Sequence, residues 1–324
     1  MGKLHDRRSI CAEVIGLNTQ RIDYKDLLAK AKMLNACEEV YLFEDAPSYM
    51  ISLSDSSRLI IVANEKLNRN NCKVYLNSCL SDFNGNIKIV GYNDKITAVE
   101  NLFYNLQVKS IDLSELYLPS LEQFVTIFNN CDVDKIIMPK MQYDKLKELV
   151  DVFYKTEFRE LDMDDFDSLA IESFVGMFNL VRTNELKIKL STEKAVTARG
   201  MFSGATIKKL DLSEFNLGNI QNLENLFQYA DIGELILGKQ HMTSRVLLLN
   251  AMFNKARIPV IDISQVTFDS RVYIMNMFLN CEAKKIITGD LDLHRHKSTR
   301  DVFRGCNAEL VTNLNSVREM YEAR

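Results

Sequence analysis

Apolar residues recur along most of this chain at one fixed interval. The clearest column is a phenylalanine that returns every 24 to 26 residues, so that nine copies stand in one register. Its members are Phe103, Phe128, Phe153, Phe178, Phe202, Phe227, Phe253, Phe278 and Phe303. A fixed period of this length is typical of a solenoid, in which each unit packs mainly against its two neighbours.

Two further apolar patterns predict the elements of each unit. Residues one and four places before the phenylalanine are mostly apolar, as Met201 and Ala198 are before Phe202. Such spacings of three and four are typical of one face of a helix. Residues eight and ten places after it are also apolar, as Leu210 and Leu212 are, and inward positions two apart are typical of a β-strand. We therefore predict one strand and one short helix in each unit.

The period selects among the known repeat folds. A unit of about 25 residues is too short for a two-helix repeat and fits the 20 to 29 residues of leucine-rich repeats. The predicted fold class is an α/β solenoid, a leucine-rich-repeat-like stack of about nine strand-plus-short-helix units. We expect an N-terminal cap or small divergent domain at 1–94, the solenoid at 95–313 and a C-terminal capping helix at 314–324.

The first 94 residues lack the phenylalanine register. Their apolar pattern predicts one helix and four short strands, at 24–35 and at 39–43, 58–63, 73–76 and 87–90 respectively. Because a solenoid needs an atypical end to cover its open core, we interpret this segment as a divergent cap. A separate small domain with an activity of its own is the alternative interpretation.

Three strings within the repeats carry a family resemblance. They are SIDLSELYLPSLEQFVTIFNNC (110–131), LDLSEFNLGNIQNLENLFQYA (210–230) and VIDISQVTFDSRVYIMNMFLNC (260–281). Each resembles the BspA-type leucine-rich repeat of bacterial surface proteins, and the resemblance covers about residues 95–313. It implies a solenoid used for binding, often at a cell surface, and it does not imply an enzyme.

The outward strand position between the two inward ones is the candidate binding surface. This column consists of Asp112, Ile137, Asp162, Lys187, Asp211, Ile236, Asp262 and Ile287. One interpretation is an ordinary solvated strand surface, on which each Asp bonds to nearby backbone or serine groups. The other is a surface for a protein partner, because apolar residues on a solvated face often mark interaction sites. The sequence leaves both open.

Charge and composition restrict the classes of function. The net charge of -4 argues against a nucleic-acid-binding protein, which usually carries a strongly basic face. The chain contains no P-loop and no GxGxxG, HExxH or GxSxG motif, so we expect no catalytic residues and no cofactor.

No apolar run approaches the length of a membrane span. Without a leader-like segment the sequence predicts a cytoplasmic protein, or a cell-surface protein if a leader was removed.

The cysteines and histidines give little sign of a metal site. Cys131, Cys281 and Cys306 share one column with Ala, Val and Thr, so we expect small buried side chains with free thiols. Cys281 and Cys306 fall in adjacent units, where their Cα atoms are expected to lie about 5 Å apart, within disulfide range. His294 and His296 stand two apart in a basic stretch, which favours a surface loop over a pair of metal ligands.

These observations predict a non-enzymatic scaffold that recognises a macromolecular partner, a protein, with its repeat surface. It would act as an inhibitor, adaptor or sensor by covering that partner. An extracellular bacterial adhesin is one alternative, and an enzyme activity located in residues 1–94 is another.

Overall fold

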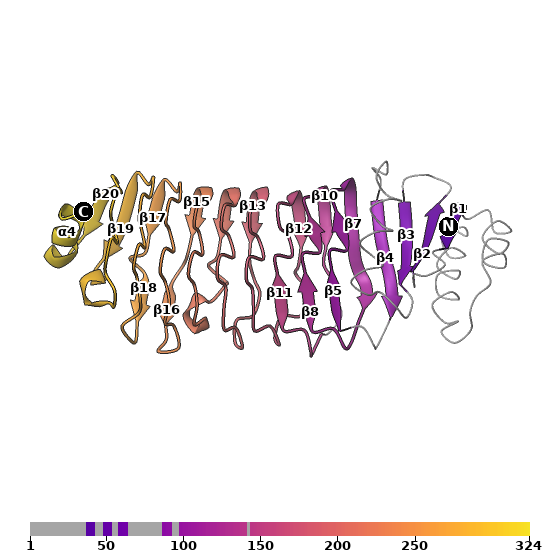
Figure 1. Cartoon of the computed structure of the whole chain (residues 1–324), viewed down its shortest axis with the longest axis horizontal. Coiled ribbons are helices and arrows are strands. Elements are labelled where there is room, and N and C mark those ends of the chain that lie inside the picture. The colour runs from indigo at the N-terminus through magenta and orange to yellow at the C-terminus, as the bar shows by residue number, and fades with distance from the viewer. Residues whose placement is uncertain (1–36, 43–47, 54–57, 64–85, 93–96, 141–142) are drawn as a thin grey trace. The chain divides into compact units, whose positions relative to one another are not determined.

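Parallel strands from successive turns of the chain build the fold (Figure 1). The computed structural model describes residues 37–42, 48–53, 58–63, 86–92, 97–140 and 143–324. These residues form a β-solenoid of about nine turns with few helices. The chain divides into two units. The first contains Met1–Ile127, Cys131–Leu146 and Glu160–Asp167, and the second contains Phe128–Asn130, Lys147–Arg159 and Ser168–Arg324.

The first unit contains a sheet whose strand order is β1-β2-β3-β4-β7-β10. Its strands are β1 (Cys37–Leu42), β2 (Ser48–Leu53), β3 (Arg58–Ala63), β4 (Asn86–Tyr92), β7 (Gln107–Tyr117) and β10 (Asp132–Ile137). The first three pair antiparallel, and the later pairs are parallel. Shorter strands of this unit are β5 (Ala98–Glu100), β6 (Phe103–Tyr104) and β8 (Gln123–Val125).

The strands predicted at 39–43, 58–63 and 87–90 are confirmed as β1, β3 and β4. The pattern did not predict β2. The helix predicted at 24–35 and the strand predicted at 73–76 lie outside the described residues. The division into segments 1–94, 95–313 and 314–324 stays a prediction.

The second unit contains two parallel ladders. One comprises β12 (Glu157–Asp162), of which residues 157–159 belong to this unit, β13 (Arg182–Lys187), β14 (Thr206–Asp211) and β15 (Asp231–Ile236). The other comprises β17 (Val260–Asp262), β19 (Lys285–Gly289) and β20 (Glu309–Thr312). Shorter strands are β9 (Phe128–Asn129), β11 (Glu148–Val150), β16 (Gln240–Met242) and β18 (Val266–Phe268). The helical segments among the described residues are η1 (Leu217–Asn219), η2 (Leu293–Arg295) and α4 (Asn315–Glu322).

The phenylalanine column forms the centre of the second unit. Its eight phenylalanines, from Phe128 to Phe303, are at most 1% exposed. The centroids of consecutive rings lie 5.1 to 5.6 Å apart, and the ring planes differ by no more than 17°. Parallel displaced rings at this separation attract one another in addition to burying apolar area. At the C-terminal end, the Tyr321 ring of α4 meets the Phe303 ring edge-on at 5.3 Å.

The segment around each phenylalanine consists of consecutive turns, which corrects the predicted short helix. Residues two before and two after the phenylalanine adopt positive φ, as Gly200 (62°) and Gly204 (65°) do around Phe202. L-amino acids other than glycine and asparagine rarely adopt this left-handed conformation, and it interrupts an α-helix. The apolar side chains still point inward at spacings of three and four, which is why the sequence pattern imitates a helix.

The backbone N–H groups of these turns alternate between two kinds of hydrogen bond. Met201 donates within its own turn to the carbonyl of Ala198 (3.1 Å). The next residue, Phe202, donates to the carbonyl of Leu226 in the following turn of the solenoid (2.9 Å). This alternation gives the buried backbone groups the hydrogen-bond partners that they require. It also joins successive turns of the solenoid.

We predict that Phe253→Ala lowers the free energy of unfolding by about 3–5 kcal/mol, because it removes a ring stacked on both faces and leaves a cavity. Urea unfolding followed by circular dichroism measures the change. Tyr273→Ala is the matched control, since this aromatic side chain is 40% exposed, and it should cost less than about 1 kcal/mol. Equal losses for both variants would show that the stack is not the core.

Candidate binding surface on the sheet face

The structure brings members of the predicted column into direct register within each unit. In the first unit Ile137 pairs with Asp112. In the second unit Asp211 pairs with Lys187 on one side and with Ile236 on the other. Asp262 likewise pairs with Ile287. The column is therefore a row of neighbours, and Asp162 occupies the corresponding last position of β12.

The aspartates of this row form local turns at the ends of their strands. The Oδ1 atom of each accepts a hydrogen bond from the backbone N–H two residues later, over 2.8 Å for Asp112 and 2.9 Å for Asp211 and Asp262. Asp162 accepts a longer bond of 3.3 Å. These Asx turns are typical of strand ends. At Asp211, burial raises the carboxyl pKa, but hydrogen bonds from Ser213 and the charge of Lys187 outweigh it, so the pKa lies below its ordinary value.

The isoleucines of the row alternate with these aspartates for a packing reason. Ile236 and Ile287 are each followed two residues later by a glycine with positive φ, namely Gly238 (69°) and Gly289 (56°). A Cβ added to Gly238 would lie only 2.9 Å from the Cα of Ser213 in the preceding turn. An Asp-x-Ser strand end thus fits against an Ile-x-Gly strand end.

The three isoleucines Ile137, Ile236 and Ile287 are half-buried, so the row exposes less apolar surface than the sequence predicts. Lys187 is exposed and forms an ion pair with the carboxylate of Glu214, which lies in the next turn just after the end of β14. The local bonds and the alternation therefore account for much of this row without a partner.

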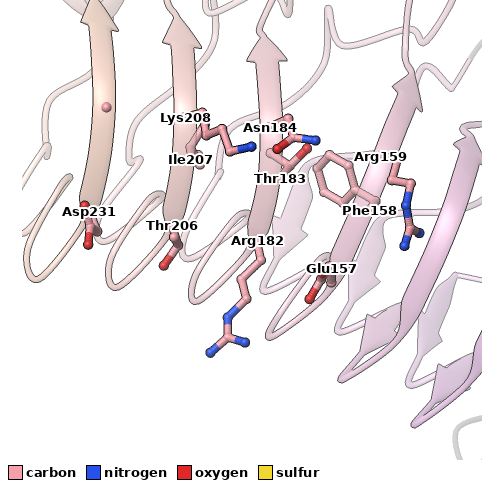
Figure 2. A pocket seen from close by; sticks show the side chains of 11 residues that line it. Glu157, Phe158, Arg159, Arg182, Thr183, Asn184, Thr206, Ile207, Lys208 and Asp231 are labelled. Atoms are coloured by element: carbon pink, nitrogen blue, oxygen red, sulfur yellow. The ribbon is translucent and has the colours of Figure 1, made fainter.

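A hollow with a volume of about 400 Å³ lies on the same sheet, at the beginning of the strands (Figure 2). It is lined by the first residues of β12, β13, β14 and β15: Glu157, Phe158, Arg159, Arg182, Thr183, Asn184, Thr206, Ile207, Lys208, Asp231 and Gly233. Gly233 occupies the position at which its neighbours carry Lys208 and Asn184, so the surface is lowered there. A Cβ on Gly233 would meet the carbonyl oxygen of Lys208 at 2.6 Å.

The charges around this hollow are incompletely paired. Asp231 binds the Nε atom of Arg257 at 3.3 Å, and Lys209 on the same sheet reaches Glu185 at 3.5 Å. On the ladder of β19 and β20, Lys285 reaches Glu309 at 3.6 Å. In the part of the chain that the structure describes, no carboxylate lies within ion-pair distance of Arg182 or Lys208. Both side chains are exposed, so the hollow offers two cations to a ligand.

Sequence reasoning missed this hollow because its residues are not alike from turn to turn. The signal was the glycine at 233 in an outward column that carries longer polar side chains in the preceding turns, as at Arg159 and Lys208. A glycine inside a strand often marks a close approach of another backbone or a ligand.

The histidines and cysteines singled out in the sequence do not come together in one site. His294 is exposed, whereas His296 is half-buried with its ring edge-on to Phe268, and burial lowers its pKa. Among the described residues no group of three His, Cys, Asp or Glu side chains is arranged to hold a metal ion. Nor does any helix there combine the length and apolar character needed to cross a membrane. Cys131, Cys281 and Cys306 are buried, as predicted, and Cys281 and Cys306 carry free thiols.

We predict that Gly238→Ala is more destabilising than Gly200→Ala. Both glycines have positive φ, which costs an alanine of order 1 kcal/mol. Only Gly238 also faces backbone at 2.9 Å, whereas the nearest atom to a Cβ at Gly200 lies 3.7 Å away. We therefore expect an additional loss of about 1–3 kcal/mol for Gly238→Ala in urea unfolding. Similar losses for the two variants would contradict the proposed fit against Ser213.

Comparison with known proteins places the repeats in a family. The family model described as "Mycoplasma protein of unknown function, DUF285" matches residues 147–257 and again residues 196–316. No curated protein and no solved structure matches the chain. The two matches overlap, as a model built from several similar units allows, and together they cover more than half of the sequence. The chain therefore belongs to the DUF285 family of Mycoplasma proteins of unknown function.

Proposed function

We propose that this protein is a non-enzymatic scaffold that binds a protein partner on the sheet face of β12 to β15, and that it recognises an extended acidic segment of that partner. The observation that carries the proposal is the hollow in which Arg182 and Lys208 are exposed without a carboxylate partner in the described residues. Solenoids commonly bind their partners along such repeated faces.

The geometry of the hollow fits an extended chain. Arg182 and Lys208 belong to adjacent parallel strands, because Arg182 pairs with Thr206, two residues before Lys208. Neighbouring strands lie about 4.8 Å apart, and side chains on one face of an extended peptide recur about every 7 Å. Two acidic side chains on one face of a peptide can thus reach both cations. The Asn184 amide and the Thr206 hydroxyl supply further hydrogen-bonding groups beside them.

The surrounding charges favour an acidic protein over a nucleic acid. Glu157 and Asp231 stand at two sides of the hollow, and Glu185 and Glu234 are exposed next to it. A continuous phosphate backbone would meet these carboxylates as well as the two cations, whereas a protein segment can place its acids only where the cations are. Such like-charge contacts give selectivity against the wrong ligand.

We expect the double variant Arg182→Glu/Lys208→Glu to bind acidic ligands at least tenfold more weakly than the wild type. Reversing two charges replaces two favourable contacts with repulsion, and a tenfold change corresponds to about 1.4 kcal/mol. The measurement is the fluorescence anisotropy of a labelled extended peptide of alternating Glu and Ser. Capture from native-cell lysate with quantitative mass spectrometry then identifies which proteins the double variant loses.

Lys284→Glu is the matched control, because Lys284 is also an exposed lysine of the second unit but lies outside the hollow. It should keep the wild-type affinity. Raising the salt concentration should weaken wild-type binding, because exposed charges are screened. Equal binding by the wild type and the double variant would refute the proposal.

An extracellular adhesin is the second candidate function, supported by the resemblance of the LDLS-containing strings to BspA-type repeats. Membership of the BspA-type family remains a proposal, and so does the cytoplasmic location that the sequence predicts. If the protein acts at the surface, protease treatment of intact native cells should remove it while a cytosolic enzyme survives. Protection equal to that of the cytosolic enzyme would exclude the adhesin. The enzyme hypothesis concerns residues 1–94, most of which lie outside the described residues.

A further inference from the structure

Two buried thiols lie next to each other near the C-terminal end of the second unit. Cys281 and Cys306 each stand three residues after a phenylalanine of the stack, namely Phe278 and Phe303. Their exposed fractions are 2% and 0%, and both thiols are free. The two thiols are close enough for each to shift the pKa of the other. Elsewhere in this column of the second unit the residues are Thr156, Val181, Ala205, Ala230 and Ala256.

The two turns that carry the cysteines are held against each other by ring stacking and by backbone hydrogen bonds. The Phe278 and Phe303 rings stack with centroids 5.2 Å apart. Phe278 and Asn280 donate backbone hydrogen bonds of 2.8 Å to Val302 and Arg304, which keeps the two turns in register up to the cysteines. Disulfides usually join Cα atoms about 4.4–6.8 Å apart, a range that includes this spacing between turns.

The surroundings make one of the two sulfurs the better nucleophile. The Cys281 thiol, the backbone N–H of Ala308 and the Arg324 guanidinium together lower the pKa of Cys306 to about 7, although burial acts in the opposite direction. The Cys306 thiol in turn raises the pKa of Cys281, to which burial and the charge of Glu282 also contribute. The other titratable group facing Cys306 is the phenol of Tyr321, whose own pKa is raised by burial.

Tyr321 of α4 and Arg324, which follows the helix, contact the turn that contains Cys306. In inner turns the carbonyl three residues after the phenylalanine accepts a hydrogen bond from the next turn, as Ala205 does from the N–H of Asp231. At Cys306 this carbonyl instead accepts hydrogen bonds from the Nε atom of Arg324 (2.7 Å) and the hydroxyl of Tyr321 (3.3 Å). The Tyr321 hydroxyl also donates to the carbonyl of Ala308 at 2.5 Å. Short helices with few buried residues open at low cost, and α4 buries only Val317, so this cover can move without unfolding the stack.

We propose that Cys281 and Cys306 are a redox-active dithiol, which low-molecular-weight disulfides convert into an inter-turn disulfide when α4 opens. The Cys306 thiolate attacks one sulfur of the small disulfide, forms a mixed disulfide and releases one small thiolate. Cys281 then loses its proton to water and attacks the Cys306 sulfur, which releases the second small thiolate. The two cysteines are oxidised, the small disulfide is reduced to two thiols, and the site is independent of the proposed binding surface.

The test exposes the full-length folded protein to oxidised glutathione and maps the products by mass spectrometry of non-reduced peptides. The wild type and the control variant Cys131→Ser should both form the Cys281–Cys306 bond. Cys281→Ser should stop at a mixed disulfide on Cys306. The reaction rate should rise as the pH increases through about 7, because the Cys306 thiolate is the reacting species. Failure to form the bond, at a glutathione disulfide concentration that oxidises the urea-unfolded protein, would overturn the proposal.

A second variant tests the cover. Tyr321→Phe keeps the ring on Phe303 but removes the hydroxyl that donates to Cys306 and Ala308. It should accelerate disulfide formation up to about tenfold, because loss of these hydrogen bonds populates the open helix. An unchanged rate, together with an unchanged circular dichroism spectrum, would show that α4 does not control access to the pair.

Discussion

The stacked phenylalanine rings set the distance between turns, and the other features of the second unit depend on that distance. Centroid separations of 5.1 to 5.6 Å are slightly larger than the spacing of about 4.8 Å between paired strands, as expected for displaced rather than directly superposed rings. The backbone hydrogen bonds from Phe128 through Phe278 of the column to the next turn hold the same register. Each outward side chain consequently has a defined neighbour above and below it.

The register explains which parts of the fold the sequence could predict. Nine phenylalanines at nearly equal intervals identify the core because burial acts on every turn in the same way. The short helix was predicted wrongly because apolar spacings of three and four fit consecutive turns equally well. The distinguishing signal was glycine or asparagine two residues before or after the phenylalanine, as at Gly200, Gly204 and Asn225, where φ is positive. Glycine and asparagine tolerate this conformation best.

The candidate surface shows where a repeat pattern stops being informative. The aspartates of the predicted row were open to two interpretations, and the hydrogen bonds of Asp211 and Asp262 to the backbone support the structural one. The hollow, by contrast, depends on Gly233 next to Lys208 and on an Arg182 side chain that forms no ion pair among the described residues, although Glu157 is its cross-strand neighbour. These are relations between particular residues of adjacent turns, so they emerge only once the strand register is known.

The end of the stack presents a problem that inner turns do not have. An inner turn satisfies its outward-facing carbonyls with the next turn, but β20 is the last strand, and exposed strand edges are prone to pair with other chains. Helix α4 and the residues that follow it supply side chains here: the Tyr321 ring covers Phe303, and Tyr321 and Arg324 donate to the carbonyl of Cys306. The contacts that close the stack are also the contacts made with the Cys306 turn. Under the proposed chemistry, formation of the Cys281–Cys306 disulfide therefore requires these closing contacts to open.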